Sequence, residues 1–180
     1  YHAIYRHDKE HAAPGYYRVH LEGSDILVEL TATERAGIQQ YTSGKDGMLH
    51  VVIDLGFAIN WDRPVDTYLY MYEDNAISGH RHSTGWAKNQ KVFFHTEFSK
   101  NFNSYYFVDD DLELSDSYDI QGKKVKGLFS FDMKKGEKLV VKTGLSAVDN
   151  EGARRNVRTE CPGWDFEYIQ ALAYAVWNRE

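Results

Sequence analysis

The stretch YYRVHLEGSDILVELTATE, residues 16–34, decides the fold class. In its first half Tyr17, Val19 and Leu21 alternate with more polar residues, and the second half, ILVELTATE, repeats this period of two. Successive side chains of a β-strand point to opposite faces, so the alternation is typical of strands with one buried face. Between the halves, Glu22–Asp25 provides a short polar loop that contains a glycine. The stretch is therefore predicted to form a β-hairpin.

Most of the remaining chain has the same character. Turn-forming residues at 43–47, 74–75 and 134–136 separate further short segments rich in β-branched and aromatic residues. These strand candidates are GIQQYT, MLHVVIDL, TYLYMYE, the run around AISGHRHSTGW, KVFFHTEFS, KGLFSFDM and EKLVVKTGLS. Many short strands at this spacing favour an antiparallel sandwich or barrel over alternating strands and helices. The sequence therefore predicts a mainly β fold, an antiparallel β-sandwich over residues 1–147.

Two helices are predicted after the sandwich. The segment 149–158 is rich in helix formers and has Glu151 and Arg155 at a favourable i, i+4 spacing. Pro162-Gly163 ends this helix, and a second helix is predicted to begin after Asp165, whose side chain can cap it. One face of the second helix carries Ile169, Leu172, Ala173, Val176 and Trp177.

Length, charge and cysteine content exclude several classes of protein. A chain of 180 residues forms one domain, which at this size buries about 70% of its unfolded surface without disulfides. The formal charge of -6 argues against nucleic-acid binding, which needs a basic surface. The single cysteine cannot form an internal disulfide, and no apolar run is long enough to span a membrane. The abundant aromatic residues suit both a β-rich core and a surface that binds sugars.

His7–His11, HDKEH, matches the H-x-x-E-H motif in which two histidines hold zinc and a glutamate activates water. The motif requires a helix, because only there do the two imidazoles lie one turn apart. Pro14-Gly15 follows at once, and no third ligand is marked. We therefore expect a polar loop before the first strand, and no metal.

Gly79–His82, GHRH, places His80 and His82 two residues apart, so that both imidazoles lie on one face of a strand. Metal-binding cupins, which this spacing resembles, have a glutamate four or five residues further along. This chain has Trp86 and Ala87 there. Because no further ligand is marked, we expect no tightly bound metal at this motif either. A polar, sugar-facing strand end beside Trp86 and ordinary surface or packing histidines remain as alternatives.

The acidic run DDDLELSDSYD, residues 109–119, has the oxygen ligands that calcium prefers, but it lacks the glycine and the alternation of a calcium-binding loop. It is predicted to be a solvated loop. Cys161 has no designated base beside it and is not expected to act as a nucleophile. No pair of carboxylates can be singled out for acid–base catalysis without their distances.

Seven runs spread over the chain carry a resemblance to a known family. In chain order they are HxxEHAAPGYYRVHL, ELTATERAGIQQYT, VVIDLG, SGHRHSTGW, VFFHTEFS, GEKLVVKTGLSAVDNEGARRN, and CPGWDF with WN after it. Together they resemble the amino-terminal domain of glycoside hydrolase family 92, whose members are exo-acting, calcium-dependent α-mannosidases. The runs ELTAT, EGARRN and PGWDF are the most specific. The resemblance extends from His7 to Asn178, and its departures, in residues 60–66 and 109–119, are expected to be loop variation.

Proteins of this family join a β-sandwich, similar to the galactose mutarotase supersandwich, to an (α/α)6 barrel through linking helices. The resemblance implies that residues 1–147 are part of the sandwich. Residues 148–180 would be helical linkers toward a catalytic barrel in cis that lies outside this chain. The terminal helix would then leave its apolar face partly uncovered, and self-association through that face is expected.

The reaction of the family resembles inverting hydrolysis, in which one carboxylic acid protonates the leaving oxygen and a second carboxylate activates water. In the family both carboxylates, and most of the calcium contacts, belong to the barrel. The resemblance therefore implies that this chain has no catalytic residue, metal ligand or cofactor of its own, and is inactive when isolated from an α-1,2-type α-mannosidase. It would supply one wall of the mannose site, between the two domains. The candidate sugar contacts are His80, His82 and Trp86, since imidazole and indole offer hydrogen bonds and an apolar face.

Two classes of function remain open. The first is a non-catalytic domain of an α-mannosidase that degrades mannose-containing glycans. The second is a free-standing carbohydrate-binding module, whose terminal helix would be capped and covered. An aldose epimerase is not supported, because no catalytic pair of His and Glu can be assigned. The resemblance also implies a secreted or periplasmic enzyme, although the chain itself shows no export signal.

Overall fold

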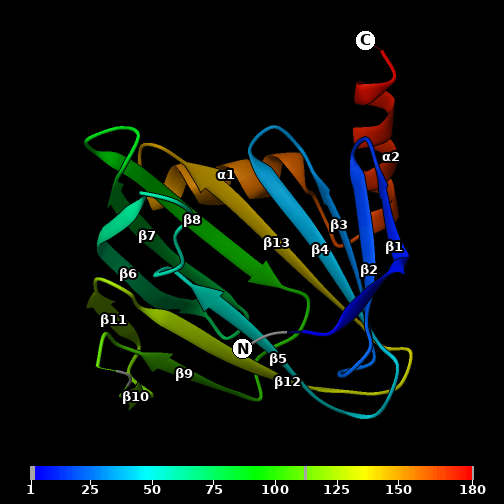
Figure 1. The fold of residues 1–180 in the computed structure, drawn as a ribbon, viewed down its shortest axis with the longest axis horizontal. Helices are drawn as coiled ribbons and strands as arrows, with labels where there is room; N and C mark the ends of the chain where they lie inside the picture. The colour runs from blue at the N-terminus through cyan, green and yellow to red at the C-terminus, as the bar shows by residue number, and fades with distance from the viewer. Residues whose placement is uncertain (1–2, 112, 180) are drawn as a thin grey trace.

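The structure is a computed structural model that describes residues 3–111 and 113–179. Its strands form two antiparallel sheets, and two helices follow them (Figure 1). The larger sheet has nine strands in the order β1 (Tyr5–Ala13), β2 (Tyr16–Leu21), β3 (Ile26–Ala32), β4 (Ala36–Ser43), β13 (Lys138–Ser146), β8 (Gln90–Phe98), β7 (Ala76–Thr84), β6 (Arg63–Glu73) and β11 (Asp119–Gly122). The smaller sheet has four strands in the order β10 (Leu114–Ser115), β9 (Ser104–Val108), β12 (Lys126–Met133) and β5 (Gly47–Asp54). The predicted antiparallel β-sandwich is confirmed.

The hairpin predicted over residues 16–34 is present as β2 and β3. Leu21 pairs with Ile26 at its closed end. Asp25 has φ 56°, a left-handed conformation that Asp tolerates better than most residues. His20 Nε2 lies 2.9 Å from Asp25 Oδ1, so the two side chains close the turn. The alternation in the sequence and the turn residues therefore identify this unit correctly.

Two apolar clusters lie on opposite faces of the larger sheet. The cluster between the two sheets includes Leu49, Leu69, Ile77, Phe98, Phe107, Phe129, Phe131, Leu139 and Val141. The cluster between the larger sheet and the helices includes Ala36, Ile38, Val140, Val157, Cys161, Phe166 and Ile169. Strand β13 contributes to both, which explains why residues 139–141 of its sequence, KLVVKTGLS, form an unbroken apolar run instead of alternating.

The two helices follow β13, which ends at Ser146. Asp149 accepts a hydrogen bond from Gly152 N at 2.6 Å at the start of the first helix. Asp165 accepts one from Tyr168 N at 2.9 Å at the start of the second, as predicted. The helices are α1 (Asn150–Glu160), which lies across β8, β13 and β4, and α2 (Phe166–Trp177), which extends beside β2 and β3 (Figure 1).

One predicted helix contact is wrong. Glu151 pairs with Arg154, with both carboxylate oxygens 2.8 Å from guanidinium nitrogens, and not with Arg155. Residues three or four positions apart lie on the same side of a helix, so either arginine could reach Glu151. Here the guanidinium of Arg154 donates one hydrogen bond to each oxygen of the Glu151 carboxylate. Neither helix in the described part of the chain is long and apolar enough to cross a membrane.

A buried lysine fixes the connection between the helices to the sheet. Lys142 of β13 is only 3% exposed. Its ammonium donates to the carbonyl oxygens of Cys161 at 3.2 Å and Gly163 at 3.0 Å, and lies 3.2 Å from Oε2 of Glu97. The Trp164 ring lies 4.1 Å from the same nitrogen. The three N–H donors of the ammonium are thus shared between the sheet and residues 161–163.

Glu97 of β8 completes this network. Its Oε1 accepts a hydrogen bond from Arg158 Nε of α1 at 2.9 Å and lies 3.4 Å from His95 Nε2. The His95 ring, the Arg158 guanidinium and the Lys142 ammonium hold the pKa of Glu97 well below its usual range. The carboxylate therefore stays ionised between two cationic side chains from different elements.

The amino-terminal segment differs from the prediction. His7–His11 lies within β1, an edge strand paired with β2, and not in a loop. The prediction failed because most β1 side chains are exposed, so the strand is held by backbone pairing and has no apolar alternation. On a strand, residues four apart are about 13 Å from each other. This distance excludes the H-x-x-E-H zinc geometry.

The acidic run is also more ordered than predicted. Residues 109–119 include β10 and the first residue of β11, while Leu112 lies outside the described residues. Asp110 accepts hydrogen bonds from Lys123 N at 3.0 Å and Lys124 N at 2.5 Å. The sequence pattern missed these strands because they have only two and four residues.

We predict that Lys142→Met lowers the free energy of unfolding by about 3 kcal/mol, because it leaves a carboxylate and two carbonyls without their common donor. Lys138→Met is the matched control on the same strand. Lys138 pairs with Glu167 of α2 at 3.0 Å, but both side chains are exposed, so its loss should cost less than about 1 kcal/mol. Urea unfolding of the two variants measures the difference. Equal losses in the two variants would contradict the assignment.

Candidate functional site

The two histidines of the GHRH motif lie side by side on β7. His80 and His82 project from the same face of the strand, and their rings stack with centroids 4.3 Å apart and an interplanar angle of 18°. Phe93 of β8 contacts both rings edge-on, at 5.7 and 5.8 Å. The period of two in the sequence therefore predicted the shared face correctly.

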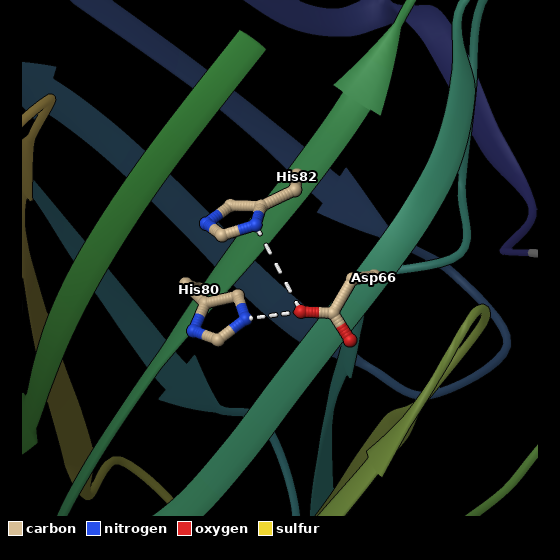
Figure 2. Close-up of side chains that lie close together, drawn as sticks. All are labelled: Asp66, His80 and His82. Carbon is tan, nitrogen blue, oxygen red and sulfur yellow. Dashed lines mark hydrogen bonds and ion pairs between the residues drawn. The ribbon is translucent and has the colours of Figure 1, made fainter. Parts of the chain in front are cut away.

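A carboxylate joins the pair. Asp66 of β6 is the Cα partner of His82, and its Oδ2 lies 2.8 Å from His80 Nε2 and 3.8 Å from His82 Nδ1 (Figure 2). The other oxygen, Oδ1, accepts a hydrogen bond from Gln121 Nε2 of β11 at 2.8 Å. Three neighbouring strands thus hold one polar cluster of a carboxylate and two imidazoles.

Burial and hydrogen bonding set the charges of this cluster. Hydrogen bonds from Gln121 and His80 lower the pKa of Asp66. Burial, with the neighbouring His80, lowers the pKa of His82. Nε2 of His82 is buried and has no hydrogen-bond partner among the described residues. At neutral pH the cluster therefore contains an ionised carboxylate beside a neutral His82.

Trp86 lies apart from this cluster, in the turn between β7 and β8. Its side chain is 89% exposed. The loop between β5 and β6 exposes further large apolar side chains. Together we call these residues the aromatic rim: Phe57, Ile59, Trp61 and Trp86.

Arg81 of β7 anchors the β5–β6 loop of the aromatic rim to the larger sheet. It projects from β7 on the face opposite to the histidines, and its guanidinium donates to the carbonyl oxygens of Leu55 at 2.9 Å and Phe57 at 3.2 Å. It also donates to Asp62 Oδ2 at 2.5 Å and lowers the pKa of that carboxyl. At Gly85 a Cβ atom would lie 3.0 Å from Asp62 Cα, so the β7–β8 turn packs closely against the loop. The rim is therefore anchored to the sheet.

The predicted site residues thus fall into two places. His80 and His82 direct nitrogens toward Asp66, whereas Trp86 faces open solvent. The sequence gives no sign of Asp66, because residues 60–66 depart from the family pattern and are expected to be loop variation. The structure instead places residues 63–66 in β6. The pairing of two predicted strands, TYLYMYE and AISGHRHSTGW, could have indicated Asp66. The first of these begins at Thr67, and adding the residue before it brings Asp66 opposite His82. Cys161 is buried, and burial raises the pKa of its thiol, which disfavours the thiolate that a nucleophile would need.

Comparisons with known proteins identify relatives. The profile of the glycosyl hydrolase family 92 N-terminal domain matches residues 1–146. A family GH92 α-mannosidase from Bacteroides thetaiotaomicron, solved in complex with mannoimidazole, is 33% identical with a TM-score of 0.91 over 99% of this chain. A family GH92 inverting mannosidase from Bacteroides thetaiotaomicron VPI-5482 is 24% identical with a TM-score of 0.85 over 98% of the chain, and supports the fold. The comparison with curated proteins gave no match.

The relatives are much longer than this chain. It covers 24% of the first mannosidase and 23% of the second. The fold similarity also extends to a bacterial glucoamylase solved with acarbose, at 10% identity and a TM-score of 0.61. The profile match, together with 33% identity over nearly all of the chain, shows the family. This chain belongs to glycosyl hydrolase family 92 and contains the N-terminal domain of that family.

Proposed function

We propose that this chain is the non-catalytic N-terminal sandwich of an α-mannosidase and forms one wall of the mannose site, at the interface with a catalytic (α/α)6 barrel. The observation that carries the proposal is the 33% identity, over 99% of this chain, to an α-mannosidase solved in complex with mannoimidazole. The chain spans about a quarter of that relative, which leaves room for a barrel in the remainder. The parent enzyme would be inverting, of the α-1,2 type, and secreted or periplasmic.

The carboxylates of this chain support a non-catalytic role. Glu97 and Glu160 form ion pairs with basic side chains. Asp66 is hydrogen-bonded to Gln121 and His80, and Asp110 accepts hydrogen bonds from backbone N–H groups. An inverting hydrolase needs one raised-pKa acid and one free base about 6.5 to 9.5 Å apart. The shifts in Asp66, Glu97 and Glu160 all lower the pKa, opposite to what a general acid needs.

The metal-ligating side chains that come together among the described residues do not suit calcium. Calcium takes six to eight oxygen ligands. Among the described residues, the group of three side chains that could hold a metal ion has one carboxylate and two imidazoles. We therefore assign the calcium of the parent enzyme to its barrel, as we do the two catalytic carboxylates.

The aromatic rim is the part of the sandwich best suited to contact a sugar. Trp86 presents an indole face to solvent, and an exposed apolar cluster of this kind is typical of binding surfaces. The Arg81 contacts hold the neighbouring loop in place, so the rim is pre-formed. His80 and His82 are weaker candidates than Trp86, because their nitrogens face Asp66 or are buried.

We predict that the purified chain alone does not hydrolyse an aryl α-mannoside or mannobiose, with or without added calcium, because it lacks the acid and the base. Release of mannose is the measurement. Calcium-dependent hydrolysis at an enzyme-like rate would contradict the proposal. Tight binding of mannose by the inactive chain would instead favour the alternative, a free-standing carbohydrate-binding module.

We predict that Trp86→Ala, in the longer protein that joins this chain to its barrel, lowers kcat/KM for a mannobiose about 2- to 12-fold, as expected for the loss of one aromatic contact. Tyr118→Ala is the matched control. Tyr118 is also an exposed aromatic residue, but its backbone contacts Met71, near the end of β6 that is remote from the rim. An equal loss in both variants would contradict a specific role of the rim.

One face of α2 leaves large apolar side chains exposed, and this exposure supports a docking partner outside this chain. Ile169 and Ala173 are buried against the sandwich, but Leu172, Val176 and Trp177 are exposed. We propose that in the parent enzyme the barrel packs over these three side chains. In the isolated chain, a second copy is the available substitute, because exposed apolar side chains gain free energy when they leave water.

We predict that the double variant Val176→Ser, Trp177→Ser reduces concentration-dependent self-association and lowers the free energy of unfolding by at most about 1 kcal/mol. Ile169→Ser on the same helix is the control and should cost about 3 kcal/mol, because Ile169 is buried. Sedimentation and urea unfolding provide the two measurements. If the double variant loses several kcal/mol as a monomer, the face belongs to a complete core and the proposal is wrong.

A further inference from the structure

The cluster of Asp66, His80 and His82 has the donor atoms of a transition-metal site. One oxygen and one nitrogen from each imidazole lie within 4.8 Å of one another. Strand geometry produces this convergence: His80 and His82 share a face of β7, and Asp66 lies opposite on the adjacent β6. None of the three ligand positions depends on a flexible loop.

The spacing of the donor atoms is close to that of a zinc site. Zinc binds nitrogen and oxygen at about 2.0 to 2.2 Å in a tetrahedron, which puts ligand atoms about 3.3 Å apart. Here Asp66 Oδ2 lies 2.8 Å from His80 Nε2 and 3.8 Å from His82 Nδ1. Side-chain shifts of less than about 1 Å would equalise these two distances.

The surroundings of the cluster also suit a bound ion. Gln121 holds the second oxygen of Asp66, as an outer partner orients a metal ligand. His82 Nδ1 lies 3.8 Å from Asp66 Oδ2, so it faces the carboxylate that would share the ion. The side chains of His80, His82 and Asp66 are 17%, 25% and 34% exposed, which leaves access for an ion and a water ligand.

We propose that Asp66, His80 and His82 bind one zinc ion through Oδ2, Nε2 and Nδ1, with water as the fourth ligand. The sequence predicted no metal here because it marked no further ligand, and Asp66 supplies that ligand. Two imidazoles and one carboxylate favour zinc over calcium and magnesium, which take oxygen ligands. The ion would tie β6 to β7 at this edge of the sheet. This proposal is independent of the proposed mannosidase function.

Isothermal titration of the chain, purified without a histidine tag and treated with a chelator, tests the proposal with zinc chloride at neutral pH. We expect one zinc per chain with a dissociation constant in the micromolar range or tighter, and no saturable binding of calcium or magnesium. His80→Gln and His82→Gln should each abolish the saturable binding. His20→Gln is the matched control, because His20 also lies 2.9 Å from a carboxylate, that of Asp25, but no second imidazole from the described residues joins the two.

Gln121→Ala is a second variant that keeps all three ligands and should weaken zinc binding about 10-fold. Cobalt provides an independent readout, since a tetrahedral site gives it a strong visible absorption that His80→Gln and His82→Gln should remove. The proposal is overturned if the chain shows no saturable zinc binding. It is equally overturned if binding persists unchanged in His80→Gln and His82→Gln.

Discussion

The Lys142 ammonium joins parts of the molecule that lie far apart in the sequence. It contacts Glu97 of β8 and the carbonyl oxygens of Cys161 and Gly163, between the two helices. An ammonium removed from water is tolerated only with complete pairing, so residues 161–163 must follow one path over the sheet. That path fixes where α2 begins, and therefore which of its side chains are buried and which face outward. The surface that the chain offers to a neighbouring domain thus depends on one residue of β13.

The charged and imidazole side chains of the GHRH motif in β7 project from opposite faces of the larger sheet. Arg81 points toward the smaller sheet and anchors the loop of the aromatic rim, while His80 and His82 point away from it and meet Asp66. Successive residues of a strand alternate between faces, so one short motif, GHRH, supports both arrangements. A metal ion at the histidines would therefore leave the contacts of the rim intact. The proposed roles in sugar contact and metal binding can be tested separately for this reason.

The sequence predicted the elements whose signal is local. The β2–β3 hairpin, the Asp165 cap of α2 and the shared face of His80 and His82 all follow from patterns within a few residues. Strand β1 was missed because its side chains are exposed and only its backbone pairs. Asp66 was missed because its place beside His82 depends on the register of two strands, which a pattern along one strand does not contain. The role of Lys142 was missed for the same reason, since a lysine in an apolar strand gives no sign of the carbonyls that it binds.

The most direct test of the central claim is a double-mutant cycle between Lys142 and Glu97, measured as free energies of unfolding. The variants are Lys142→Met, Glu97→Gln and the two combined. If the ion pair fixes the helical segment on the sheet, the double variant should lose less than the sum of the single losses, with a coupling of about 2 kcal/mol. Losses that add within about 0.5 kcal/mol would show that the two residues act independently, and would contradict the account.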